Sequence, residues 1–274
     1  MLTKNSWFNT TLPDRLLDKA AAFKLVLTPY QFKEMDFNSA ADYTCMEIYA
    51  KYKNLYLALS GGLDSEFILR CCYRNNVPVK PIIVKCGNDK EMRFALDACS
   101  ELNITPIVLE LSEQQLLEYF KENVFDKFAG VGYNSTHNLI AADYVSKIDN
   151  AYLLSGNHLI SDDNKVISDI EYCFAYEWDF YTDYFINPCI NINFYIYTME
   201  LVYATAPKAT TTWAEYKHSL FNLSPRDKIR HSYSDNTMAT LMGLLKSTHK
   251  YKKNVGEVWT KQQFYEFFDN YKGA

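Results

Sequence analysis

The chain has 274 residues, enough to bury a full hydrophobic core as one large domain or as one domain with an appendage. Hydrophobic residues make up 48% and charged residues 22%, a composition that excludes a disordered chain. The net charge of −5 argues against a protein made chiefly to coat nucleic acid. No apolar stretch reaches the roughly 18 residues of a membrane span, and the N-terminus lacks the apolar core of a signal peptide. We therefore expect a cytoplasmic protein without a membrane partner.

The seven cysteines indicate a reducing compartment, because they are odd in number and show no Cys-x-x-Cys spacing. Cys71, Cys72 and Cys99 fall inside apolar helical patterns, where a free thiol packs as a small hydrophobic side chain. The five histidines are dispersed as well. The sequence favours neither a zinc site nor a disulfide framework.

Residues 1–54 precede the regular part of the pattern, and we expect them to cover one edge or face of the sheet that follows. Residues 23–28 alternate like a strand, which Pro29 ends. Asn38 or Ser39 is expected to cap a helix that runs to about Tyr52.

Residues 55–165 alternate between short apolar runs and helical patterns, and we expect them to form one α/β domain. The apolar runs predict strands at 55–59, 81–85, 104–111 and 151–154. Helical spacing predicts helices near 65–76, 90–102 and 134–148, with a further helix capped by Ser112. Such alternation predicts βαβ units, so the expected fold class is α/β, a doubly wound parallel sheet. Ligands of such sheets bind at the carboxyl ends of the strands.

A polar loop follows the first predicted strand directly. Its residues are Ser60, Gly61, Gly62, Leu63, Asp64 and Ser65, and they contain the only adjacent pair among nine glycines. Adjacent glycines allow a tight turn, and the N–H groups at the start of the following helix form an anion site. The serine hydroxyls add donors, and a carboxylate here suits Mg²⁺ beside bound phosphates. The pattern predicts a phosphate-binding loop.

The kind of phosphate loop follows from its residue order. No lysine follows the glycines as in a Walker A loop, and no Gly-x-Gly-x-x-Gly fingerprint is present. Residues 60–65 instead resemble the Ser-Gly-Gly-x-Asp-Ser loop of the PP-loop (N-type) ATP pyrophosphatases. The resemblance implies an adenine nucleotide alpha-hydrolase-like fold, bound ATP and Mg²⁺, and release of AMP and pyrophosphate. It also implies that residues 60–65 bind the phosphates and that Asp64 is catalytic by holding the metal.

A second polar loop follows the predicted strand at 151–154 and contains Gly156 and the acid pair Asp162–Asp163. Adjacent acids are commonly solvated turn residues, but beside a phosphate loop they are also candidate Mg²⁺ ligands. Residues 153–156 resemble the strand and glycine of the synthetase domain of asparagine synthetases, which implies that Gly156 contacts the nucleotide. In that family the acid pair follows the glycine two positions sooner than it does here.

Glutamine-dependent asparagine synthetases begin with a catalytic cysteine and a glutaminase domain, whereas this chain has Leu2 and only 54 residues before the first predicted strand. We therefore expect nitrogen to come from ammonia, from an amine substrate, or from a separate glutaminase or other protein partner.

Residues 166–274 lose the strand–helix rhythm, and we expect a mostly helical, aromatic-rich C-terminal subdomain. Its aromatic side chains either pack as a layer on the sheet or line a pocket for a small-molecule acceptor. The basic residues that are candidates for neutralising phosphate charge are Lys208, Lys217, Arg226, Lys228 and Arg230. Residues 246–253 are most simply a solvated loop, with a nucleic-acid contact as the less favoured interpretation.

Three hypotheses follow. The first is an ATP-dependent, AMP-forming ligase or amidotransferase, similar to asparagine synthetase, that adenylylates an acceptor and transfers nitrogen to it. The second is a tRNA or nucleobase modification enzyme of the same superfamily. The third is a non-catalytic nucleotide-binding protein that keeps the fold.

Overall fold

The computed structural model describes residues 7–11, 24–86, 89–122, 136–156, 191–205, 219–223 and 261–273. Within these ranges no helix is both long enough and apolar enough to span a membrane. The acid pair Asp162–Asp163 and the basic candidates of the C-terminal part lie outside the described residues.

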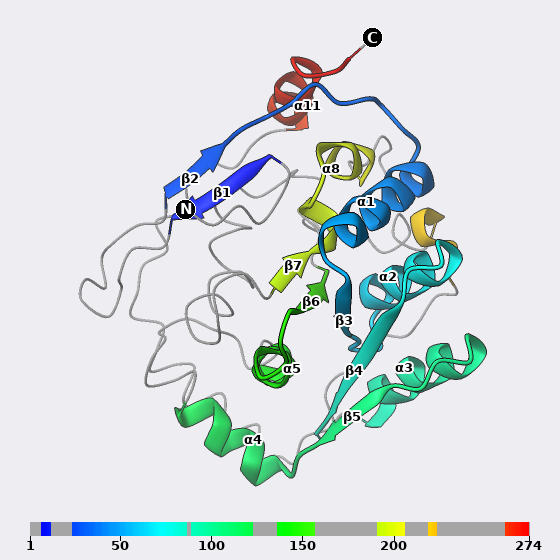
Figure 1. Ribbon diagram of the computed structural model, residues 1–274, viewed down its shortest axis with the longest axis vertical. Helices are drawn as coiled ribbons and strands as arrows, with labels where there is room; N and C mark the ends of the chain where they lie inside the picture. The colour runs from blue at the N-terminus through cyan, green and yellow to red at the C-terminus, as the bar shows by residue number, and fades with distance from the viewer. Residues whose placement is uncertain are drawn as a thin grey trace.

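A five-stranded sheet forms the centre of the molecule, as Figure 1 shows. Its strands are β3 (Asn54–Ala58), β4 (Val79–Lys85), β5 (Ile107–Glu110), β6 (Ala151–Ser155) and β7 (Asn191–Asn193). Their spatial order is β5-β4-β3-β6-β7, and every neighbouring pair is parallel. The chain therefore builds outward from β3 in one direction, then returns to the other side of β3 with β6.

Helices cover both faces of this sheet. They are α1 (Phe37–Lys51), α2 (Leu63–Arg74), α3 (Asp89–Glu101), α4 (Glu113–Phe120) and α5 (Thr136–Ser146). Buried side chains of the first three pack with one face of β3, and buried side chains of the last two pack with the other face. Apolar residues on both faces of the strands explain why the strands appear in the sequence as continuous apolar runs. The predicted doubly wound α/β fold is confirmed.

The predicted elements between residues 54 and 155 agree with the observed ones, apart from small differences at their ends. Ser112 caps α4 as predicted, in a capping box with Gln115. The cap of α1 was predicted wrongly, since it is Asp36 and not Asn38 or Ser39. The Asp36 carboxylate accepts hydrogen bonds from the Ser39 amide at 3.1 Å and from its hydroxyl at 2.6 Å. The helix therefore begins at Phe37, which is buried in its first turn.

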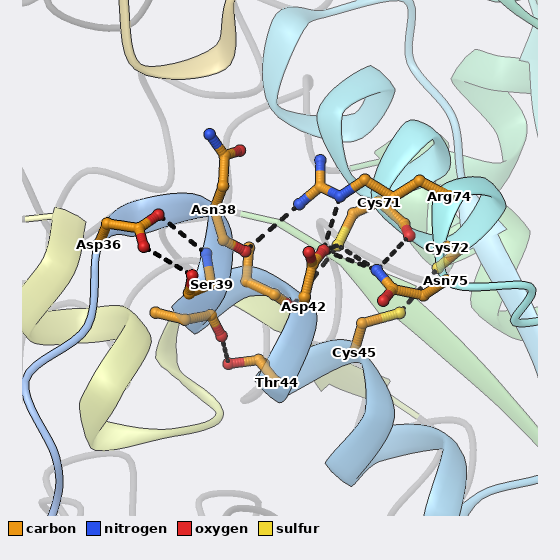
Figure 2. Close-up of polar contacts among 12 residues, drawn as sticks. Asp36, Asn38, Ser39, Asp42, Thr44, Cys45, Cys71, Cys72, Arg74 and Asn75 are labelled. Carbon is orange, nitrogen blue, oxygen red and sulfur yellow. Dashed lines mark hydrogen bonds and ion pairs between the residues drawn. The ribbon is translucent and has the colours of Figure 1, made fainter.

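The packing of α1 against α2 combines an ion pair with buried thiols (Figure 2). The Asp42 carboxylate accepts hydrogen bonds from Arg74 Nε and Asn75 Nδ2, both at 2.6 Å. Beneath this contact the Cys45 and Cys72 sulfurs lie 3.7 Å apart. The described cysteines are free and buried, as expected for thiols that pack as small hydrophobic groups.

A smaller aromatic cluster lies beside the sheet and joins distant parts of the chain. It includes Trp7, which directly precedes strand β1 (Phe8–Thr11), and residues of strand β2 (Lys24–Leu27), helix α8 (Met199–Thr205) and helix α11 (Lys261–Asp269). Strands β1 and β2 pair antiparallel, and Figure 1 shows these elements on one side of the molecule. The buried Trp7 indole donates a hydrogen bond to the Ile196 carbonyl at 3.0 Å. This cluster ties both ends of the described chain to the residues that follow β7.

Candidate functional site

The predicted phosphate loop lies at the point where the chain stops adding strands on one side of β3 and begins to add them on the other side. Strand β3 leads into residues 60–62 and then into α2, while β6, which pairs with β3 on its other side, ends at Ser155. In open α/β sheets ligands bind outside the carboxyl ends of the strands at this switch point. The sequence predicted both loops at strand ends, and the topology places those ends on adjacent strands.

Gly61 gives the loop its shape. Its φ is +83°, in the left-handed region that favours glycine. A β-carbon at this position would lie 2.0 Å from the backbone carbonyl oxygen of Glu91 in α3. The loop therefore folds against the first turns of α3 in a way that no larger residue allows.

The two loop serines hold the turn closed. Ser60 Oγ and Ser65 Oγ lie 3.2 Å apart, and the Gly62 amide donates to Ser60 Oγ at 3.3 Å. The Ser65 hydroxyl also lies 3.1 Å from the Gly62 carbonyl. These are long, easily exchanged hydrogen bonds between groups that also suit phosphate oxygens.

Helix α2 starts directly from this turn, with Gly62 as its N-cap and no side chain capping it. The first backbone bond of the helix runs from the Glu66 amide to the Gly62 carbonyl at 3.2 Å. Amides before that point have no carbonyl partner inside a helix, and they carry the positive end of its dipole. The turn thus presents the donors that an anion binds.

Asp64 lies in this first turn, and its Oδ1 atom is buried. Its backbone carbonyl accepts a hydrogen bond from the Tyr195 hydroxyl at 2.8 Å. Burial, and next the nearby charge of Asp64, raise the pKa of Tyr195 well above the ordinary phenol value. The phenol therefore remains a protonated donor, and the Asp64 charge lies close to it.

Gly156 directly follows β6 and packs closely against α2. A β-carbon there would lie 2.6 Å from Ile68 Cδ1 and 2.7 Å from Tyr195 Cε2. The preceding hydroxyl, Ser155 Oγ, is buried and makes no hydrogen bond within the part of the chain that the structure describes. The end of β6 thus carries a buried hydroxyl and a glycine that packing requires.

The structure thus brings residues 60–65 and Gly156 to one place, while Asp162 and Asp163 lie outside the described residues. Within the described ranges no three histidine, cysteine or acidic side chains gather as a metal site would need. Cys86, at the end of β4, is buried, and burial raises the pKa of its thiol to about 11. This cysteine has the properties of a packed side chain and not of a nucleophile.

Sequence reasoning missed Tyr195 as part of this region. Residues 194–197 appeared only as an aromatic run, with packing or an acceptor pocket as interpretations. The structure places Tyr195 in the 3-10 helix η3 (Phe194–Ile196), directly after β7. No local pattern identifies this residue, because its polar partner lies 131 positions earlier in the chain.

No family model and no curated protein matches the sequence. Several solved structures show limited similarity. The ammonia-dependent NAD synthetase from Campylobacter jejuni is 16% identical, over 81% of this chain and 100% of that chain, with a TM-score of 0.38. NMN synthetase from Francisella tularensis is 15% identical, over 81% of this chain and 96% of that chain, with a TM-score of 0.36. The glutamine-dependent NAD⁺ synthetase from Acinetobacter baumannii is 13% identical, over 48% of this chain and 28% of that chain, with a TM-score of 0.32.

TM-scores this low carry no argument about the activity of this chain. None of these three structures is named an asparagine synthetase, so that branch stays a prediction from the sequence.

Proposed function

We propose that this protein is an ATP-dependent, AMP-forming ligase or amidotransferase of the PP-loop ATP pyrophosphatase type. The observation that supports it is the glycine–serine turn at the switch point, where Gly61 adopts a left-handed φ of +83° and α2 begins without a side-chain cap. This donor set fits the pyrophosphate part of ATP, which carries several negatively charged oxygens. Gly61 and Gly156 support the fit, because each stands where a side chain would meet other atoms.

In the proposed reaction, an oxygen of the acceptor attacks the α-phosphorus of ATP. The bond from that phosphorus to the bridging oxygen breaks, and pyrophosphate leaves. The amides at the start of α2, with the hydroxyls of Ser60 and Ser65, stabilise the charge that develops on the leaving group. Asp64 is the described carboxylate that would hold Mg²⁺, which supplies further charge neutralisation. The catalytic contribution is mostly positioning and electrostatics.

A nitrogen nucleophile then displaces AMP from the adenylylated acceptor. We propose a small carboxylate-bearing acceptor, as in asparagine synthetases, with ammonia or an amine as donor or nitrogen supplied by a separate glutaminase. The resemblance of residues 153–156 to that family supports this choice of acceptor. Cys86 does not support sulfur transfer, because its buried thiol stays protonated at neutral pH.

The test is pyrophosphate and AMP formation from ATP and Mg²⁺ across carboxylate acceptors, aspartate among them, with an ammonium salt as donor. Asp64→Asn should lower the rate at least about 100-fold, the loss typical of removing a group that stabilises transition-state charge. Glu113→Gln is the matched control, because Glu113 also lies in the first turn of a helix that follows a strand. We expect that control to retain the rate. Formation of ADP and inorganic phosphate alone would contradict the proposal.

A further inference from the structure

Tyr195 contacts residues of both predicted loops, Asp64 in the first and Gly156 in the second. It follows β7, on the far side of β6 from β3, and the residue is 1% exposed. A tyrosine buried to this degree requires a partner for its hydroxyl, since burying an unpaired hydroxyl is costly.

The hydroxyl of Tyr195 contacts the first loop. It donates a hydrogen bond of 2.8 Å to the backbone carbonyl of Asp64, in the first turn of α2. A helical carbonyl at this position already accepts the amide four residues later, so it does not need a second donor. The hydroxyl therefore contributes little to satisfying the helix and instead fixes where the turn that carries Asp64 lies.

The ring of Tyr195 contacts the second loop. A β-carbon on Gly156 would lie 2.7 Å from Tyr195 Cε2 and 3.1 Å from Tyr195 Cδ2. The ring therefore occupies the space that a side chain at position 156 would need. One side chain thus touches the start of α2 through its hydroxyl and the end of β6 through its ring.

Other aromatic rings hold the Tyr195 ring in place. Phe67 of α2 is stacked with it at 6.4 Å between centroids, Phe221 lies at 6.0 Å, and Phe194 packs edge-on at 5.4 Å. A ring surrounded in this way keeps one orientation, because close-packed interiors leave no room for another.

We propose that Tyr195 is a positioning residue that fixes the spacing between the Ser60–Ser65 loop and Gly156, and thereby the orientation of the Asp64 carboxylate toward bound Mg²⁺ and pyrophosphate. This inference rests on the proposed function, because it assigns Tyr195 a role in that same site. It predicts that losing the hydroxyl alone weakens metal-dependent pyrophosphate binding while the core remains folded.

The test compares Tyr195→Phe with Tyr203→Phe in the full chain. Tyr203 is a matched control, because it is also buried and its hydroxyl donates to Asp269 at 3.1 Å, in the aromatic cluster around α8 and α11. Calorimetric titration with pyrophosphate measures affinity at several Mg²⁺ concentrations. Tyr195→Phe should lower the affinity about 5- to 10-fold, the loss expected for one buried hydrogen bond. It should also raise the half-saturating Mg²⁺ concentration, whereas Tyr203→Phe should change neither quantity.

Unchanged Mg²⁺ dependence and affinity in Tyr195→Phe would overturn the inference, and so would equal losses in the two variants. A wild-type protein that binds no pyrophosphate with Mg²⁺ would overturn the proposed function, and the inference with it. That failure is visible without any variant, so the two are distinguishable.

If Tyr195→Phe does not fold, site-specific incorporation of 3-fluorotyrosine at position 195 keeps the hydroxyl and reports on it. The fluorine resonance should shift when Mg²⁺ and pyrophosphate are added together, and shift less with either alone. An unchanged resonance would overturn the inference.

Discussion

Two strand-to-helix turns lie at the same edge of the sheet and differ in how the helix that follows is capped. At the turn from β5 to α4, the Ser112 hydroxyl accepts from the Gln115 amide at 3.2 Å, and Gln115 Oε1 accepts from the Ser112 amide at 2.8 Å. At the turn from β3 to α2, Gly62 is the N-cap and no side chain caps the helix. The first helix therefore starts with a complete capping box, whereas the second starts without a side-chain cap.

The difference separates a structural turn from a candidate binding turn. A capping box stabilises a helix by about 1 kcal/mol but uses the amides that an anion would need. The uncapped turn of α2 gives up that stabilisation, and its glycines bring the backbone to the switch point of the sheet. A glycine at the N-cap position therefore indicates a candidate anion-binding turn when another helix that follows a strand of the same sheet has a capping box.

The largest expected effect on stability comes from a substitution that disrupts the backbone of the uncapped turn. Gly61→Ala should destabilise the protein by about 3 kcal/mol or more, because it combines a left-handed backbone with a clash against the Glu91 carbonyl. Gly62→Ala is the control, since its β-carbon would meet only Ser60 Oγ at 3.3 Å. Urea unfolding of both variants measures the difference. Similar losses in the two variants would contradict this account of the loop.

A smaller effect is expected at the capped turn. Ser112→Ala should lower the free energy of unfolding by about 1 kcal/mol, because it leaves the Gln115 amide without its acceptor. Pyrophosphate binding should remain unchanged, since α4 packs on the opposite face of the sheet from α2. The measurements are urea unfolding and calorimetric titration with Mg²⁺ and pyrophosphate. A loss of binding in Ser112→Ala would argue against separate roles for the two turns.

The smallest expected effect on stability comes from a substitution that makes the start of α2 resemble the capped start of α4. Gly62→Ser introduces a preferred N-cap at the start of α2 and should raise the free energy of unfolding by a few tenths of a kcal/mol. It should also weaken pyrophosphate binding, because the new hydroxyl competes for the same amides. Thermal unfolding and titration on one sample show whether the two quantities move in opposite directions. Tighter binding with higher stability would refute the competition.

Much of the fold was predictable because the sequence patterns that specify it lie within short segments of the chain. Apolar runs buried on both faces mark β3, β4 and β6, and Ser112 with Gln115 forms a capping box within four residues. The strand β7 was not predicted, because three residues are too few to show periodicity.

The candidate site was predictable only where one short segment carries it. Residues 60–62 form one turn and residues 63–65 begin α2, so their order in the sequence already describes their arrangement. The contact of Gly61 with the Glu91 carbonyl involves a backbone atom, which no side-chain pattern encodes. The contact of Tyr195 with Asp64 depends on β7 lying beside β6, and this neighbourhood is a property of the sheet order.

The distance along the chain between Asp64 and Tyr195, 131 positions, also bears on when the loop becomes ordered. Contacts so far apart in sequence form after local ones, and chains fold from the N-terminal end as they are synthesised. A nascent chain that ends before β7 contains four strands of the sheet and the whole Ser60–Ser65 turn, but lacks the phenol that holds this turn against β6. Since β7 is the last strand that the structure describes, the contact between Tyr195 and Asp64 forms in the growing protein only after β7 has emerged from the ribosome.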